Sequence, residues 1–188
     1  MDQSRDTRKL AAIMVADVVG YSRMVAADES RTLAQLKAHL LGLVHPAIDR
    51  LRGRIFKTTG DGFLACFDSA IDAVECALHI QREMAHRTAS DAPDQKIVFR
   101  IGINVGDVLV DGDDLQGGGV NVAARMEAQA LPGGITISNT VFDHIRNRSG
   151  YAVQDMGEIS VKNIPYPIRA YRVLTGHELV SSKESATQ

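Results

Sequence analysis

Two aspartates in apolar surroundings are the residues of this sequence best suited to hold a metal ion. Asp17 lies near the end of the apolar run 10–19, and Asp61 lies in the turn Gly60-Asp61-Gly62 between two short runs of β-prone residues. A carboxylate in a strand that is buried on both faces is costly to desolvate unless it is paired or coordinates a metal. An isolated Asp-Gly is also ordinary hairpin chemistry. Together, the two aspartates predict a divalent-ion site.

Two further segments are suited to binding phosphate. Small residues just past a strand let backbone N–H groups approach an anion, so residues 18–22, which follow Asp17, are candidates for cradling phosphates. Farther along, Asn121 and Arg125 are four residues apart and share a face of a helix that should begin near Val120, after three glycines. An amide, a guanidinium and a helix N-terminus suit a phosphate. A solvated helix face behind a glycine-rich loop explains this second segment equally well.

Periodicity and turn residues predict the elements that position these groups. Two long helices are expected over 28–51, where Pro46 should kink or divide the helix, and over about 69–86. A hairpin is expected over 55–67, and a short helix ends near residue 145. Strands are expected over 10–19, 97–105, 108–110, 135–137, 151–156, 157–161 and 169–174.

This order of elements predicts an α+β fold. Strand, helix, hairpin, helix and strand give a ferredoxin-like βαββαβ sandwich with additional C-terminal α/β elements, in which helices cover one antiparallel-rich sheet. A chain of 188 residues with 45% hydrophobic residues suits one core. We therefore expect a polar N-terminal extension over 1–8, one domain over 9–175 and a polar tail over 176–188.

Composition narrows the classes of function. The formal net charge is −2 and the basic residues are scattered, so nucleic acid is not an expected partner. Cys66 and Cys76 stand among apolar residues without disulfide or metal-ligand spacing, which favours a reducing cytoplasm. No apolar run reaches the roughly 18 residues that span a bilayer, so no membrane segment is expected in this chain.

Three motifs together resemble a known family. The stretches Ala16-Asp-Val-Val-Gly-Tyr-Ser22, Lys57-Thr-Thr-Gly-Asp-Gly62 and Gly119-Val-Asn-Val-Ala-Ala-Arg125 are similar, in order and spacing, to the three signatures of the class III nucleotidyl cyclase catalytic domain, of the bacterial type. The likeness covers roughly residues 9–174. Three ordered motifs are far more specific than any one of them.

The resemblance implies a site that two subunits build together. Two Mg²⁺ or Mn²⁺ ions per site would be held by the side chains of Asp17 and Asp61 and by the carbonyl of Val18. A chain carrying both the metal ligands and the nucleotide ligands would act as a homodimer. The implied nucleotide ligands are Val19, Gly20, Tyr21, Ser22 and Lys162 for the phosphates, Asn121 for the ribose, and Arg125 for charge on the α-phosphoryl group.

Lys57 and Asp114 occupy the positions at which the family selects its purine. Adenine offers an acceptor at N1 and a donor at N6, which a lysine and a carboxylate match, whereas guanine presents the opposite pattern. The expected activity is therefore conversion of ATP to 3′,5′-cyclic AMP and pyrophosphate. Each residue also has an ordinary role, as a solvated strand lysine and as a turn aspartate.

Other functions remain open on the sequence alone. A guanylate cyclase is the nearest alternative, and a catalytically degenerate module that binds nucleotide or only dimerises is another. A diguanylate cyclase or a polymerase-type palm shares two-metal chemistry, but the turn Gly60-Asp61-Gly62 lacks the Gly-Gly-Asp/Glu-Glu-Phe pattern of the former.

Overall fold

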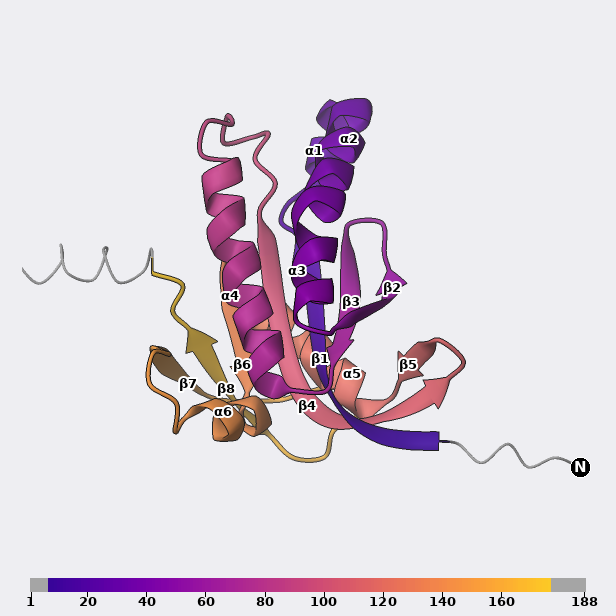
Figure 1. Ribbon diagram of the computed structural model, residues 1–188, viewed down its shortest axis with the longest axis vertical. Coiled ribbons are helices and arrows are strands. Elements are labelled where there is room, and N and C mark those ends of the chain that lie inside the picture. The colour runs from indigo at the N-terminus through magenta and orange to yellow at the C-terminus, as the bar shows by residue number, and fades with distance from the viewer. Residues whose placement is uncertain (1–6, 177–188) are drawn as a thin grey trace, which may run out of the picture.

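The computed structural model describes residues 7–176, which form one mixed sheet with helices on both faces (Figure 1). The sheet order is β2-β3-β1-β4-β6-β8-β7, and β5 pairs with the outer part of β4. In the described residues β4 and β6 run parallel, while the other neighbours are antiparallel. The strands are β1 (Thr7–Val18), β2 (Arg54–Thr58), β3 (Gly62–Phe67), β4 (Phe99–Asp111), β5 (Asp114–Gln116), β6 (Ile135–Ser138), β7 (Val153–Ile159) and β8 (Ile168–Val173).

The alternation of side chains along β1 divides the core into two layers. Ala12, Met14 and Ala16 pack toward one face, and Ala11, Ile13 and Val15 toward the other. In Figure 1 helices α3 and α4 lie in front of the sheet and α5 behind it. The front layer contains α1 (Tyr21–Ala27), α2 (Glu29–His39), α3 (His45–Arg50), α4 (Ala70–Arg87) and α6 (Asn139–Ile145), and the rear layer contains α5 (Gly118–Gln129). The prediction of a helix-covered α+β sandwich is confirmed.

The helix expected over 28–51 consists of two α-helices with a π-helical segment between them. Asp28 caps α2 by accepting a hydrogen bond from Arg31 N at 3.0 Å. A π-helical segment, η1 (Leu40–Val44), follows α2 and leads into α3. Pro46 falls in the first turn of α3, where a missing N–H costs no helical hydrogen bond. The helical segments follow one another directly, so the helix expected over 28–51 is divided next to Pro46, in agreement with the prediction.

The strands that carry the site residues are longer than expected. β1 begins at Thr7, and β4 runs through Gly106 without a turn, so the two strands pair over their whole length from Thr7↔Val110 to Val18↔Phe99. Residues 151–161, expected as two strands, contribute the single strand β7 with an irregularity between Asp155 and Gly157. Within residues 7–176 no helix is long and apolar enough to cross a membrane. Of the polar tail expected over 176–188, residues 177–188 lie outside the described residues.

Candidate active site

The strand register brings the two aspartates together. Asp17 is paired with Gly62 across β1 and β3, and Val18 N donates to Asp61 O at 2.9 Å. Gly62 permits this approach, because a Cβ at this position would lie 1.9 Å from Ala16 O. The turn before β3 therefore places the Asp61 carboxylate beside the end of β1, as the sequence predicted.

The chemistry of this pair fits a divalent cation. Asp17 Oδ1 is buried and has no hydrogen-bond partner among the described residues. A buried carboxylate oxygen without a partner costs free energy that a bound cation would recover. Residues 7–176 contain no group of three or more His, Cys, Asp or Glu arranged for a metal. An ion held here would therefore complete its shell with backbone, water and substrate oxygens, as Mg²⁺ commonly does.

A cavity of about 450 Å³ opens beside Asp61, and the loop after β1 forms its wall. Gly20 adopts φ +67, a conformation that favours glycine, at the point where the chain enters α1. Val19 does not line the cavity, and its N–H is already donated to Val98 O at 2.8 Å, so this amide is not free for a phosphate. Arg23, which the sequence reading missed, adds a guanidinium to the wall. The lining residues are Val18, Gly20, Tyr21, Ser22, Arg23 and Asp61.

Two further charged residues surround Asp17 and were not predicted. Arg100 is directly opposite Asp17 in the β1–β4 register. Glu127 projects from α5 and is only 9% exposed. Burial raises the pKa of Glu127 to about 8, helped by a hydrogen bond to Asp17 and the charges of Asp17 and Asp61, while Arg100 opposes the shift.

The two residues expected to select the purine lie side by side. Lys57 Nζ on β2 is 3.0 Å from Asp114 Oδ2 at the start of β5, although 57 residues separate them in the chain. Asp114 Oδ1 also accepts a hydrogen bond from Leu115 N at 2.8 Å. The hydrogen bond from Lys57 is the main cause of the lowered pKa of Asp114. The structure therefore presents a fixed ammonium and a fixed carboxylate at one surface.

Helix α5 presents Asn121 and Arg125 to solvent, on a face turned away from Glu127. At 3.6 residues per turn the two residues are about 40° apart around the helix, and Glu127 lies about 140° from their midpoint. Glu127 faces Asp17 of the same chain. The exposed stripe of α5 therefore points away from the aspartates of its own chain.

Asn104 on β4 fixes the beginning of α5. This side chain is 5% exposed, and its Nδ2 donates to Gly119 O at 3.0 Å. Its Oδ1 accepts from Ser138 Oγ at 2.7 Å and from Thr140 Oγ1 at 3.2 Å. The first turn of α5 is thereby bonded to the end of β6 and the start of α6 through one buried amide.

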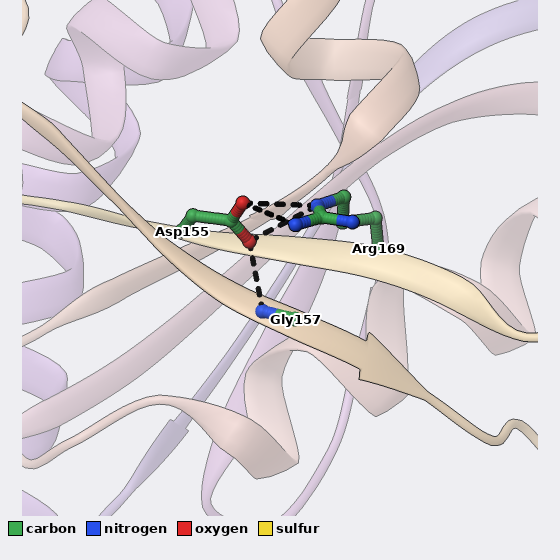
Figure 2. A network of polar contacts seen from close by, with 3 residues as sticks. All are labelled: Asp155, Gly157 and Arg169. Carbon is green, nitrogen blue, oxygen red and sulfur yellow. Dashed lines mark hydrogen bonds and ion pairs between the residues drawn. The ribbon is translucent and has the colours of Figure 1, made fainter.

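Lys162 lies on the loop between β7 and β8. The preceding residue, Val161, is buried in the same apolar cluster as Val122 and Met126 of α5, which ties this loop to the helix. At the base of the loop, Arg169 donates two hydrogen bonds to Asp155 Oδ2, at 2.6 and 3.0 Å (Figure 2). The hydrogen bonds from Arg169 hold the pKa of Asp155 below its usual value. This pair clamps the two strands that support Lys162.

The predicted site residues therefore fall into two separate groups. Asp61, Val18 and residues 20–22 line one cavity, Asp17 directly precedes Val18, and no residue of the second group lines the cavity. The second group comprises Lys57, Asp114, Asn121, Arg125 and Lys162, all on surfaces outside that cavity.

A mixed sheet that places two aspartates beside an open cavity is the arrangement expected of a nucleotidyl cyclase catalytic domain. The family described as the adenylate and guanylate cyclase catalytic domain matches residues 4–175. The chain belongs to this family.

Individual relatives agree with this assignment. A putative adenylate cyclase 3 of Rhizobium meliloti (strain 1021) is 44% identical over 164 residues, which cover 87% of this chain and 28% of that protein. An adenylate cyclase of Streptomyces coelicolor is 31% identical over 153 residues, covering 80% of this chain and 38% of that protein. The chain thus spans well under half the length of these curated relatives.

A solved structure has the same fold. The crystal structure of an adenylate/guanylate cyclase/hydrolase from Silicibacter pomeroyi superposes with a TM-score of 0.83 and 42% sequence identity. The match covers 89% of this chain and 98% of that one.

Proposed function

We propose that this domain, over residues 9–175, is an adenylate cyclase that converts ATP to 3′,5′-cyclic AMP and pyrophosphate. The observation that carries the choice of ATP is the contact of Lys57 Nζ with Asp114 Oδ2 at 3.0 Å. A lysine can donate to adenine N1 while a carboxylate accepts from N6, and guanine would meet a donor facing a donor and an acceptor facing an acceptor. The two named bacterial relatives support the same substrate. Because the substrate is ATP, the proposed location is the cytoplasm.

The proposed chemistry uses two Mg²⁺ or Mn²⁺ ions held by Asp17, Asp61 and the Val18 carbonyl. When bound, these ions make the ribose 3′-hydroxyl more acidic and neutralise the triphosphate. The 3′-oxygen forms a bond to the α-phosphorus as the bond from that phosphorus to the β-phosphate oxygen breaks. Pyrophosphate leaves, and the hydroxyl proton passes to solvent.

The chain's own residues orient the substrate for this displacement. The backbone of residues 20–22 binds phosphate oxygens, and Lys162 binds the terminal phosphates. Asn121 holds the ribose, and Arg125 stabilises the charge that develops on the α-phosphoryl group.

A homodimer follows from the separation of the two groups of residues. Asn121 and Arg125 point away from the aspartates of their own chain, so we infer that they act on a nucleotide bound at the aspartates of a second copy. A two-fold dimer would contain two equivalent sites, each with Asp17 and Asp61 from one chain and Lys57, Asp114 and Arg125 from the other.

The substrate is tested by assaying the purified chain with ATP or GTP, with Mn²⁺ or Mg²⁺, over a range of protein concentrations. We expect cyclic AMP, with a specific activity that rises as the protein is concentrated. Lys57→Glu should lower kcat/KM for ATP by roughly tenfold or more, about 1.4 kcal/mol. Lys37→Glu is the matched control, because it makes the same change at an exposed lysine of α2, away from the Lys57–Asp114 contact.

Two other results of this assay would contradict the proposal. Cyclic GMP as the main product would identify a guanylate cyclase and overturn the purine assignment. A stable dimer without any product would identify a binding or dimerisation module.

Shared sites are tested by mixing two inactive variants. Asp17→Asn and Arg125→Ala each disable both sites of their own homodimer, but a mixed dimer contains one intact site. An equimolar mixture should recover about a quarter of the wild-type activity, from half of the dimers with one of two sites working. No recovery, with subunit exchange demonstrated, would show that each chain builds its own site.

A further inference from the structure

A second cavity, of about 470 Å³, lies on the other side of α4 from α2 and α3. It is bounded by the last turns of α4, the residues that enter β4, and the turn before β6. Met84, Ala85, Ile97, Val98 and Pro132 supply an apolar lining. None of the residues assigned to the nucleotide site lines it, and its volume is that of an ordinary small-molecule pocket.

Gln81 gives this cavity an amide whose oxygen has no hydrogen-bond partner among the described residues. The side chain is 5% exposed, and both hydrogens of Nε2 are used, in bonds to Phe99 O at 3.0 Å and Gly134 O at 2.9 Å. These two bonds fix the orientation of the amide. Oε1 accepts no hydrogen bond from any described residue, although Gln81 lines the cavity. Oε1 can therefore accept a hydrogen bond from an N–H or O–H group of a ligand in the cavity, in place of water.

Positive charge lies at the same cavity. Lys96 lines it and forms no salt bridge within residues 7–176. Arg82 also lines it, and its Nε donates to Thr175 O at 3.5 Å, a long bond that leaves the other guanidinium donors available. No Asp or Glu is among the residues that line the cavity. The cavity is therefore complementary to an anion.

We propose that this cavity binds a small amphipathic acid: a molecule with an apolar body, one hydrogen-bond donor for Gln81 Oε1 and a carboxylate for Lys96 and Arg82. The three features correspond to the three kinds of group that the cavity presents. A ligand of about ten to twenty non-hydrogen atoms fits a volume of this size.

The segment that enters β4 forms one wall of the cavity and also supports the loop 18–22 that follows Asp17. Val98 lines the cavity, and its carbonyl accepts the hydrogen bond from Val19 N at 2.8 Å. Phe99 O, the next carbonyl, is held by Gln81 and by Gly133 N at 2.9 Å. An occupant therefore touches the backbone that positions the residue two places after Asp17. Binding of a ligand should therefore change the rate of the proposed reaction. This expected rate change rests on the proposed function, whereas the proposed binding does not.

The test titrates the ¹⁵N-labelled full chain with 4-hydroxyphenylacetate and follows amide chemical shifts. Two related probes remove one feature each: phenylacetate lacks the donor, and 4-methylphenol lacks the carboxylate. We expect saturable shifts of the amides of Gln81, Val98 and Gly133 with the hydroxy acid. Each reduced probe should bind at least about tenfold weaker, which corresponds to about 1.4 kcal/mol.

Two variants assign the binding to this cavity. Ala85→Trp fills the space and should abolish the shifts, while Lys96→Gln should remove the preference for the hydroxy acid over 4-methylphenol. Lys37→Gln, an exposed lysine on α2, is the matched control and should change neither.

The proposal is overturned by absence of saturation at about 10 mM hydroxy acid, an affinity weaker than about −3 kcal/mol. It is equally overturned by binding that survives Ala85→Trp or by equal affinity for the three probes. Binding without any change in cyclase rate would support the binding site and contradict its coupling to the loop 18–22.

Discussion

Gly102→Ala tests whether strand β4 sets the position of helix α5. Gly102 lies in the middle of β4, where α5 crosses the sheet. A Cβ at this position would lie 2.0 Å from Glu127 N and 2.5 Å from Ala123 O, both backbone atoms of α5. Because backbone atoms cannot rotate away as a side chain can, the whole helix must move.

The size of the movement follows from these distances. Ordinary contact with a Cβ begins at 3.4 Å, so the helix must retreat from the strand by about 1.4 Å. Overpacking of this kind costs about 1–3 kcal/mol of stability. Asn121 and Arg125 move with the helix, and a misplacement of about 1 Å in a positioned group can lower the rate about 100-fold.

The assay compares kcat and melting temperature for the wild type, Gly102→Ala and a matched control. Gly118→Ala is the control, because its Cβ would lie 3.8 Å from Ile164 Cδ1, an ordinary contact, in the same helix. We expect Gly102→Ala to remain folded by circular dichroism, with kcat reduced about 100-fold and a melting temperature several degrees lower, at about 2–4 °C per kcal/mol. Wild-type kcat and melting temperature in folded Gly102→Ala would refute the reasoning.

Three smaller perturbations test other contacts. Asn104→Ala removes the hydrogen bond that holds Gly119 O in the first turn of α5. It should lower the free energy of unfolding, measured with denaturant, by about 1–3 kcal/mol. The factor by which kcat falls should exceed the factor by which KM rises, and equal factors would contradict a positioning role. The lowered pKa of Asp155 means that its bonds to Arg169 stabilise the fold above the unfolded-state pKa and lose this effect as pH falls through the folded-state pKa. Melting temperature against pH should therefore fall less steeply at acid pH in Asp155→Asn, and parallel curves would count against the clamp. Burial raises the pKa of Cys76 to about 12, so iodoacetamide should alkylate it in urea but not in the native chain, as mass spectrometry would show.

The sequence was most informative where chemistry and backbone geometry coincide. Asp17 at the end of a buried run and Asp61 between two glycines could each be located without a structure, because few residues tolerate those positions. Lys57 and Asp114 could be located from their places in the family pattern, but their contact at 3.0 Å was not predicted. Their roles toward nucleotide remain predictions.

Contacts between distant strands and helices were beyond the sequence. Arg100 reads as a polar residue on the open face of an alternating strand, and only the β1–β4 register places it opposite Asp17. Glu127 reads as a solvated helix residue two positions after Arg125, yet it is buried toward Asp17. The one available signal for Glu127 is its helical offset of about 140° from the exposed stripe, which places it on the sheet side of α5.

The boundaries that were wrong have local causes. Gly106 was taken as a turn residue, but β1 is long enough to pair with both sides of it, so β4 continues. Gly118 and Gly119 were taken as loop, but a Cβ at Gly119 would lie 2.7 Å from Asp107 O. The glycines are therefore compatible with the helix start because they allow α5 to begin directly against β4.

Three contacts of different kinds hold α5 on β4: the bare backbone at Gly102, the amide of Asn104 on Gly119 O, and the close approach of Gly119 to Asp107 O. Two of them are backbone contacts and the third is a buried side chain held by Ser138 and Thr140, so α5 with its exposed Asn121 and Arg125 should behave as one rigid body with the sheet. Asn121 and Arg125 are then not expected to reach Asp17 and Asp61 of their own chain by a movement of α5. Under the proposed function, activity would depend on how one chain is placed against another, and we expect a controlling signal to act on that placement or on the loop 18–22 beside Val98.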